Sequence, residues 1–301
     1  MGTLDAPNQA SNGCGSGAIL LAVERWYDFP ESRGYLGNVG QFQTVRVGPS
    51  TPERGASILV STREAVISVL PEASLELLGE IEDFAKLDIT FELREKPVSS
   101  NIPNPDASSA VVSHDGATVS ALKGAITPSG ITHELLHIYR YWVEAVPQVM
   151  PIKGADTMNW RTTSSIENAL EHLVIVPREE TYGVYDEEFW NKISRTFWDK
   201  YPWPGNDYPW SRRKDCLLGW LSCMEIVTDE AVRDLAKECI DKEGYLTEAI
   251  KFHEKIMRVL LDKPRALSTV MRFLPIPFTE VLLVTFDIRK RKRICAKLPS
   301  Y

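Results

Sequence analysis

The chain has 301 residues, of which 44% are hydrophobic and 25% charged, and its net charge is −7 from 34 basic and 41 acidic residues. This composition excludes a disordered, collagen-like or coiled-coil chain, and the acidic balance argues against a general surface for polyanions. The five cysteines form no CxxC pair, which favours reduced thiols over a disulfide framework. No apolar run approaches the roughly 20 residues needed to cross a bilayer, and residues 1–17 carry no secretion signal, so we expect a cytoplasmic protein.

The first part of the chain is expected to be rich in strands. Residues 1–17, with many Gly, Asn and Ser, predict a flexible leader, and residues 18–127 predict a mixed, β-rich part. One helix is expected from Pro71, a favoured first-turn residue, and Asp115-Gly116 indicates a hairpin. Strands are expected at 18–27, 41–47, 56–60, 88–93 and 110–122.

After Pro128 the apolar spacing becomes helical, and residues 128–288 predict a helical part. Residues 289–301 form a basic tail, in which Arg289–Arg293 is expected to be a solvated charge run. The connections 147–164 and 201–211 are long enough to suggest a function, although a packed surface loop is the simpler interpretation of the second. Helices are expected at 131–146, 165–176, 187–200, 216–226, 229–240 and 247–261.

The sequence His133-Glu134-Leu135-Leu136-His137 reads HExxH within a segment of helical apolar spacing. Residues four apart on a helix share one face, so the two imidazoles can bind one Zn²⁺ while Glu134 takes a proton from water. The alternative is a helix whose two histidines are satisfied by hydrogen bonds. The pattern therefore predicts a metal site with His133 and His137 as ligands and Glu134 as general base.

A catalytic zinc site usually has three protein ligands and one open position. The continuation HExxHxxGxxH is absent, because Arg140 and Val143 stand where the Gly and the third His would be. The best source of a third ligand is the next apolar-periodic helix, on which Glu167 and Glu171 share one face.

With these residues the sequence resembles the zincin metallopeptidases, and specifically the gluzincin pattern. The resemblance implies that Glu167 is the third ligand and that Glu171 orients a ligand histidine, where the family usually has Asp. The segment Glu167…Ala169…Leu173 to Pro177 is also similar to the bacterial ImmA/IrrE type of regulatory zinc peptidase. The fold implied is an α+β, zincin-like one, with a strand-rich N-terminal part and a helix-rich C-terminal part flanking an active-site cleft.

Glu167 has a second interpretation. Ser164 and Glu167 fit a capping box, in which the carboxylate would bind the first N–H groups of its own helix. Glu171 is then the first substitute as ligand and His172 the second. Because His172 lies about 140° from the Glu167 face, at about 100° per residue, it is expected to line the cleft rather than to share the metal.

The mechanism would need a donor for the oxyanion that forms on the attacked carbonyl. His172 and Tyr182 are the preferred candidates among five residues in or near the two motif helices, the others being Tyr139, Arg140 and Arg178. In the zincin architecture a strand borders the cleft and pairs with an extended peptide, and residues 116–122 are the candidate for that strand.

The sequence thus predicts an intracellular zinc-dependent hydrolase, most simply a metallopeptidase with Zn²⁺ as cofactor and a peptide or protein as substrate. No membrane partner is expected, and no zinc-finger spacing or aromatic RNA-binding pattern supports nucleic acid. Two alternatives are a catalytically idle scaffold that binds a protein or nucleic-acid partner, and a zinc enzyme acting on a small-molecule amide. The ligand types would also accept Mn, Fe, Co or Ni.

Overall fold

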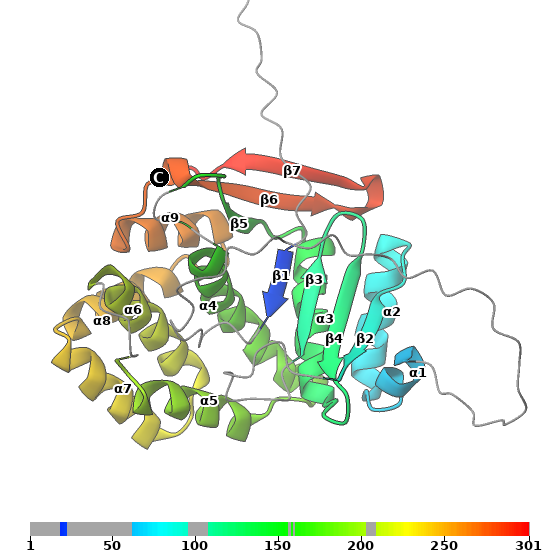
Figure 1. Cartoon of the computed structure of the whole chain (residues 1–301), viewed down its shortest axis with the longest axis horizontal. Coiled ribbons are helices and arrows are strands. Elements are labelled where there is room, and N and C mark those ends of the chain that lie inside the picture. Colours follow the sequence, from blue (N-terminus) through cyan, green and yellow to red (C-terminus); the bar gives the residue numbers. More distant parts are fainter. Residues whose placement is uncertain are drawn as a thin grey trace, which may run out of the picture.

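The computed structural model describes residues 19–22, 62–95, 108–155, 158, 160–202 and 209–300. The expected leader and the strands at 41–47 and 56–60 lie outside these residues, as does most of the 201–211 connection. The described part is a mixed α+β structure, as the sequence predicts, with a sheet and its helices on one side and a group of helices on the other (Figure 1).

A four-stranded sheet forms the first part, in the order β1-β3-β4-β2. Its strands β3 and β4 make the expected hairpin, and β2 adds to β4 in parallel while β1 adds to β3 in antiparallel orientation. The strand expected at the cleft edge, residues 116–122, corresponds to β4, and that expectation is wrong because β4 is paired on both sides. The four strands are β1 (Ile19–Ala22), β2 (Thr90–Arg94), β3 (Ser109–Val112) and β4 (Ala117–Leu122).

Three helices accompany this sheet. The helix that carries HExxH, α3 (Pro128–Trp142), packs against β3 and β4, while α2 (Glu72–Ala85) covers α3 and α1 (Thr62–Ile67) covers β2. The helix α3 begins at Pro128 because the hydroxyl of Thr127 accepts a hydrogen bond from the amide of Gly130, and proline suits a first turn. Its apolar residues join those of α2 and the sheet in one core.

The helical half has its own core, formed by the helices from α4 onward. The helix α4 (Trp160–Glu179) is longer than expected and starts before Ser164, so the capping-box interpretation of Glu167 is wrong: this residue lies inside the helix. The helix α9 lies in a segment for which the sequence analysis expected no helix. The remaining helices are α5 (Glu187–Asp199), α6 (Pro209–Ile226), α7 (Glu230–Lys242), α8 (Leu246–Met257) and α9 (Lys263–Phe273).

A three-stranded antiparallel sheet, in the order β5-β6-β7, joins the two cores. Neighbouring side chains of β6 point to opposite faces, so Leu283 belongs to the helical core and Val284 to the core of α3 and the large sheet. The basic run expected to be a solvated tail lies in the turn after β6 and in β7. The three strands are β5 (Gln148–Pro151), β6 (Val281–Asp287) and β7 (Lys292–Lys297).

The boundary between the two cores therefore runs between α3 and α4. These two helices pack directly on each other. Side chains that α3 and α4 present to one another lie where the two cores meet. No helix among the described residues is both long enough and apolar enough to cross a membrane.

Candidate metal centre

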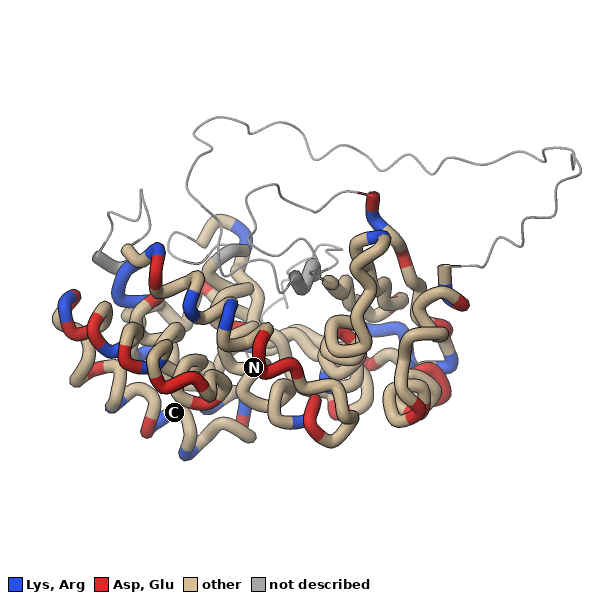
Figure 2. The backbone as a smooth tube through the Cα atoms, turned by 90° about the horizontal axis from the view of Figure 1, so that it is seen from below, with Lys and Arg blue, Asp and Glu red and all other residues tan. Residues whose placement is uncertain are grey.

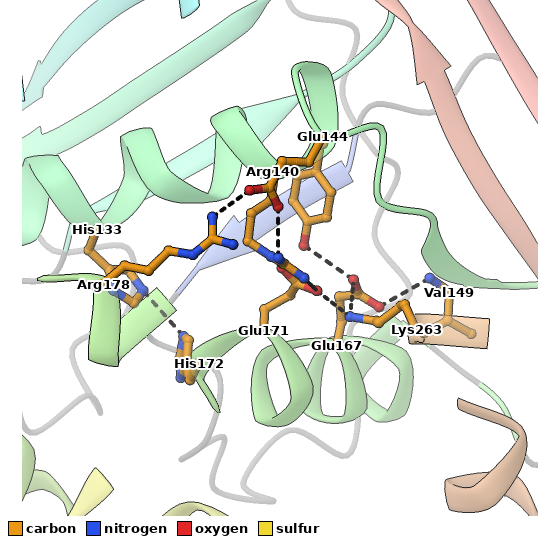
Figure 3. Close-up of polar contacts among 10 residues, drawn as sticks. His133, Arg140, Glu144, Val149, Glu167, Glu171, His172, Arg178 and Lys263 are labelled. Atoms are coloured by element: carbon orange, nitrogen blue, oxygen red, sulfur yellow. Dashed lines mark hydrogen bonds and ion pairs between the residues drawn. The ribbon is translucent and has the colours of Figure 1, made fainter. Parts of the chain in front are cut away.

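Three histidines meet between α3 and α4. His133 and His137 stand one turn apart on α3, and His172 faces them from α4 (Figure 3 shows His133 and His172). All three are buried, with exposed fractions of 4%, 1% and 2%. One ring nitrogen of each lies within 4.8 Å of the others, which makes this the group of described residues suited to hold a metal ion.

The spacing of the nitrogens suits a shared metal ion. The Nε2 atoms of His133 and His172 are 3.2 Å apart. Tetrahedral Zn–N bonds of about 2.0–2.1 Å place two ligand nitrogens roughly 3.3 Å from each other. Nδ1 of His137 is buried and has no hydrogen-bond partner in the described structure. The Nε2 atoms of His133 and His172 also lie within hydrogen-bond distance of each other, and the three imidazoles together could hold a divalent cation.

His172 therefore lies in the cluster with His133 and His137, although its angle from Glu167 predicted a position lining the cleft. The angle of about 140° relates His172 to Glu167 on the same helix. What matters is which face of α4 meets α3, and that face carries His172.

A carboxylate holds His133 in place from behind. Nδ1 of His133 is 2.6 Å from Oε1 of Glu179, whose other oxygen accepts a hydrogen bond of 3.2 Å from Nε1 of Trp190. Metal-binding histidines typically make such a contact, because it fixes the tautomer and orients the ring. Glu179 is not among the site residues predicted from the sequence. Its signal was its position seven residues after His172, two turns along the same face of α4.

Glu134 is completely buried beside the cluster, with an exposed fraction of 0%. Its Oε1 atom is 3.4 Å from the hydroxyl of Ser108, which also donates a hydrogen bond of 2.8 Å to the carbonyl of Gly130. Ser108 immediately precedes β3, so the end of that strand lies next to the glutamate of the motif.

Burial and charge set the protonation of the cluster. Burial, with the positive charges of His133, Arg140 and Lys263 after it, holds the pKa of His137 well below its usual value. Burial and the two other histidines do the same to the pKa of His172. Burial alone would lower the pKa of His133, but the hydrogen bond and charge of Glu179 outweigh it and raise that pKa. Burial thus favours the neutral forms of His137 and His172, whereas Glu179 favours the protonated form of His133.

Glu167 and Glu171 lie outside the histidine cluster, in a buried group of ion pairs one turn further along the two helices (Figure 3). Glu167 accepts hydrogen bonds from Nζ of Lys263 at 2.9 Å, from the hydroxyl of Tyr141 at 3.2 Å and from the amide of Val149 at 3.1 Å. Its carboxylate holds α4 to β5 and α9 rather than facing the three histidines.

Glu171 is paired with two cations. It contacts Arg140 on α3 through both of its oxygens and accepts a hydrogen bond of 2.5 Å from Nζ of Lys263. Burial would raise its pKa, but the charges of Lys263 and Arg140 lower that pKa to about 2. Glu167 and Glu171 thus pair with other residues, and not with the histidines as expected.

Three of the other candidates for oxyanion donor have hydrogen-bond partners other than the histidines. Arg140 binds Glu171 and Glu144, and Arg178 donates a hydrogen bond of 2.6 Å to Glu144. The hydroxyl of Tyr139 donates to Glu80 at 3.0 Å, and burial raises the pKa of Tyr182, which lies close to Glu80, Arg178 and Glu144.

The basic run after β6 is tied to the rest of the molecule. The guanidinium of Arg289 lies 4.0 Å from the ring centre of Phe84 and donates to the carbonyl of that residue. Arg291 donates a hydrogen bond of 2.9 Å to the carbonyl of Asp115. Acidic and basic residues are interspersed along the described backbone in Figure 2.

Comparison of the chain with models of known protein families, with curated proteins and with solved structures gives no match. The geometry of the three histidines and Glu134 therefore carries the functional interpretation by itself.

Proposed function

We propose that this protein is a metal-dependent hydrolase in which His133, His137 and His172 bind one divalent ion and Glu134 is the general base. The observation that carries the proposal is the meeting of three buried imidazoles from two helices, beside a buried glutamate of an HExxH motif. His172 replaces Glu167 as the third ligand, because Glu167 is engaged by Lys263, Tyr141 and Val149.

Zinc is the metal that best suits three histidine ligands with a fourth position open. When bound, the ion would polarise a carbonyl and lower the pKa of a water to about 7. The chain's own residues would do the rest. Glu134 would take the proton of the attacking water, and Ser108, which reaches both Glu134 and Gly130, would orient that carboxylate.

Glu179 would position the site without touching substrate. By accepting from Nδ1 of His133 it directs Nε2 of that ring toward His172 and the metal. Trp190 fixes Glu179 in turn, so the orientation depends on α4 and α5 as well as on α3.

Within the hydrolases we propose a peptidase, since HExxH on a helix that packs under a sheet resembles the zincin pattern. The three-histidine set departs from the gluzincin form of that pattern. A small amide or ester would be attacked by the same groups, and the assay below includes both kinds of substrate.

Metal analysis tests the proposal directly. Protein purified without added metal should hold close to one equivalent of zinc, and His137→Ala and His172→Ala should each lose nearly all of it. Glu167→Gln should keep the metal. His253→Ala is a matched control, because His253 lies on α8 and pairs with Glu225 on α6. Equal metal content in His172→Ala and the unaltered chain would contradict the ligand set.

Hydrolysis is tested with Glu134→Gln, which keeps the size of the side chain and removes the base. We expect it to retain the metal and to lose about 10²- to 10⁴-fold in turnover of a quenched fluorescent peptide library or of small chromogenic amides and esters. Unchanged turnover with full metal content would leave a metal-binding protein whose chemistry does not use Glu134.

A further inference from the structure

The histidine cluster is enclosed, and one strand lies at its border. The exposed fractions of His133 and Glu134 are 4% and 0%, so a substrate carbonyl needs a way in beside them. The strand β3 borders this place, because Ser108 directly before it contacts Glu134. One side of β3 is bound to β4.

The other side of β3 is occupied by β1, a segment from near the start of the chain. The two strands are antiparallel, with Ile19 opposite Val112 and Ala22 opposite Ser109. The strand β1 therefore runs toward Ser108 and the glutamate of the motif. In Figure 1 it lies between β3 and α4, and in Figure 3 its pale blue arrow points to the side of the view where His133 and His172 lie.

We propose that the side of β3 facing β1 is the peptide-binding edge of this site, and that β1 is the chain's own occupant of it. A substrate would be an extended, aliphatic peptide that takes the place and the direction of Ile19–Ala22. That this peptide is a substrate rests on the proposed function. That a peptide can take the place of β1 does not.

Three features support strand exchange at this place. Within the described part of the chain the pairing spans four residues, so few of the backbone hydrogen bonds described there need to break. The edge strand at the other side of the sheet, β2, is held by α1 and by Arg63, which bonds to both Glu82 and Ile89. Strand addition supplies affinity through the backbone, while side chains of the added strand give specificity.

The composition of β1 indicates the class of peptide. Ile19, Leu20, Leu21 and Ala22 carry no charge and no hydrogen-bonding side chain. The strand that they pair with contributes Ala110 and Val112 to the core, both with exposed fractions of 0%. A charged residue opposite this part of β3 should therefore bind poorly, and aliphatic residues should bind well.

The full-length chain with Leu20→Pro or Leu21→Pro tests the exchange. Amide groups of successive residues point to opposite sides of a strand, so one of the two prolines removes a hydrogen bond to β3. We expect faster hydrogen exchange at residues 109–112 in that variant. A labelled peptide with the sequence of residues 17–24 should bind it at least tenfold more tightly than the unaltered chain, measured by fluorescence anisotropy.

Two controls accompany this experiment. Ile294→Pro places a proline in β7, the outer strand of the other sheet, and should leave both readouts unchanged. The same peptide with proline at both leucine positions should not bind. Unchanged exchange at residues 109–112 and no gain in peptide binding in either proline variant would overturn the proposal.

A crosslink keeps the test decisive if the proline variants do not fold. Leu20 and Val111 are partners in the register, so Leu20→Cys with Val111→Cys should form a disulfide that holds β1 on β3. We expect the oxidised protein to lose peptide binding and the reduced protein to regain it, while the unaltered chain responds to neither treatment. Equal binding in both redox states would overturn the proposal.

The two proposals fail separately. If the histidine variants keep their metal but the strand exchanges, the proposed function is wrong and β3 remains a peptide-binding edge. If the metal is lost as expected but the strand does not exchange, the metal centre stands and its substrate enters by another route.

Discussion

The helices α3 and α4 meet in two adjacent regions of opposite character. One is the histidine cluster of His133, His137 and His172. The other, which we call the charge network, contains three acids and three bases from the α3 and α4 region and from α9. Its members are Arg140, Glu144, Glu167, Glu171, Arg178 and Lys263.

The difference lies in how far each region satisfies its own polar groups. In the charge network every carboxylate has a cation within hydrogen-bond distance, so the region needs nothing from outside. In the cluster two Nε2 atoms face each other at 3.2 Å and Nδ1 of His137 has no partner among the described residues. The acids and bases of the charge network satisfy one another, whereas the three imidazoles of the cluster form a group that could hold a metal ion.

The largest effect should come from breaking the charge network. Lys263 is buried between Glu167 and Glu171, with a side-chain exposed fraction of 4%. Lys263→Met would leave both carboxylates without this charge and should lower the free energy of unfolding by about 3–5 kcal/mol, measured in urea. Lys251→Met, at an exposed position of α8, is the control and should cost less than about 0.5 kcal/mol.

The same urea experiment on metal-free His172→Ala measures how much the histidine cluster contributes to the free energy of unfolding. Without metal the cluster is not fully paired, so removing one imidazole should cost less than Lys263→Met does. If the histidine variant is the less stable of the two, the distinction drawn between the two regions fails.

Acid should weaken the charge network through Glu171. Because Lys263 and Arg140 lower the pKa of this group to about 2, against 4.5 for an ordinary glutamate, the folded state binds its proton later than the unfolded state. The stabilisation is complete above about pH 4.5 and is lost as the pH falls toward 2.

The variant Glu171→Gln isolates that contribution. Burial raises the pKa of Glu167, which gives the opposite dependence on pH, so only the difference between the two proteins reports Glu171. Urea unfolding at pH 5, 4 and 3 should show the unaltered chain losing more stability than Glu171→Gln. Parallel losses would mean that Glu171 is not held ionised by its partners.

A smaller effect is expected at Glu179, the carboxylate that contacts His133. Glu179→Gln keeps the shape of the side chain but removes the charge that orients His133, and zinc affinity should fall about 10- to 100-fold. Competition with a chromophoric chelator measures this affinity. The neighbouring Glu180 is exposed, and Glu180→Gln should leave it unaltered.

The smallest effect is expected at Ser108. Its hydroxyl donates to the carbonyl of Gly130 at 2.8 Å and is 3.4 Å from Glu134. Ser108→Ala should lower the free energy of unfolding by about 1 kcal/mol, as for one hydrogen bond, and should keep the metal. A loss of metal in this variant would show that the contact to Glu134 supports the cluster itself.

Local patterns sufficed for part of this structure. HExxH at helical spacing is enough to place His133 and His137 on one face, because that follows from 3.6 residues per turn. The hairpin at Asp115-Gly116 and the helix from Pro71 depend on nearby residues alone, and both are present as β3–β4 and α2. The α+β character followed in the same way from the order of strand and helix patterns.

The third member of the cluster depended on packing between helices. Glu167, Glu171 and His172 all lie on α4, and only the rotation of that helix against α3 decides which of them meets the other histidines. Lys263, far along the chain on α9, binds Glu167 and Glu171. No spacing in the sequence predicts that contact. The pairing of β1 with β3 is also a long-range contact, between segments about 90 residues apart.

By itself, then, the sequence determined the helical turn that carries two imidazoles and a glutamate, since that geometry is local. The tertiary structure decided which residue completes the group, which carboxylate orients it, and which strand borders it. These features depend on how the two cores pack against each other. That packing is determined by the burial of charged and apolar groups that are far apart in the sequence, so local spacing does not predict it.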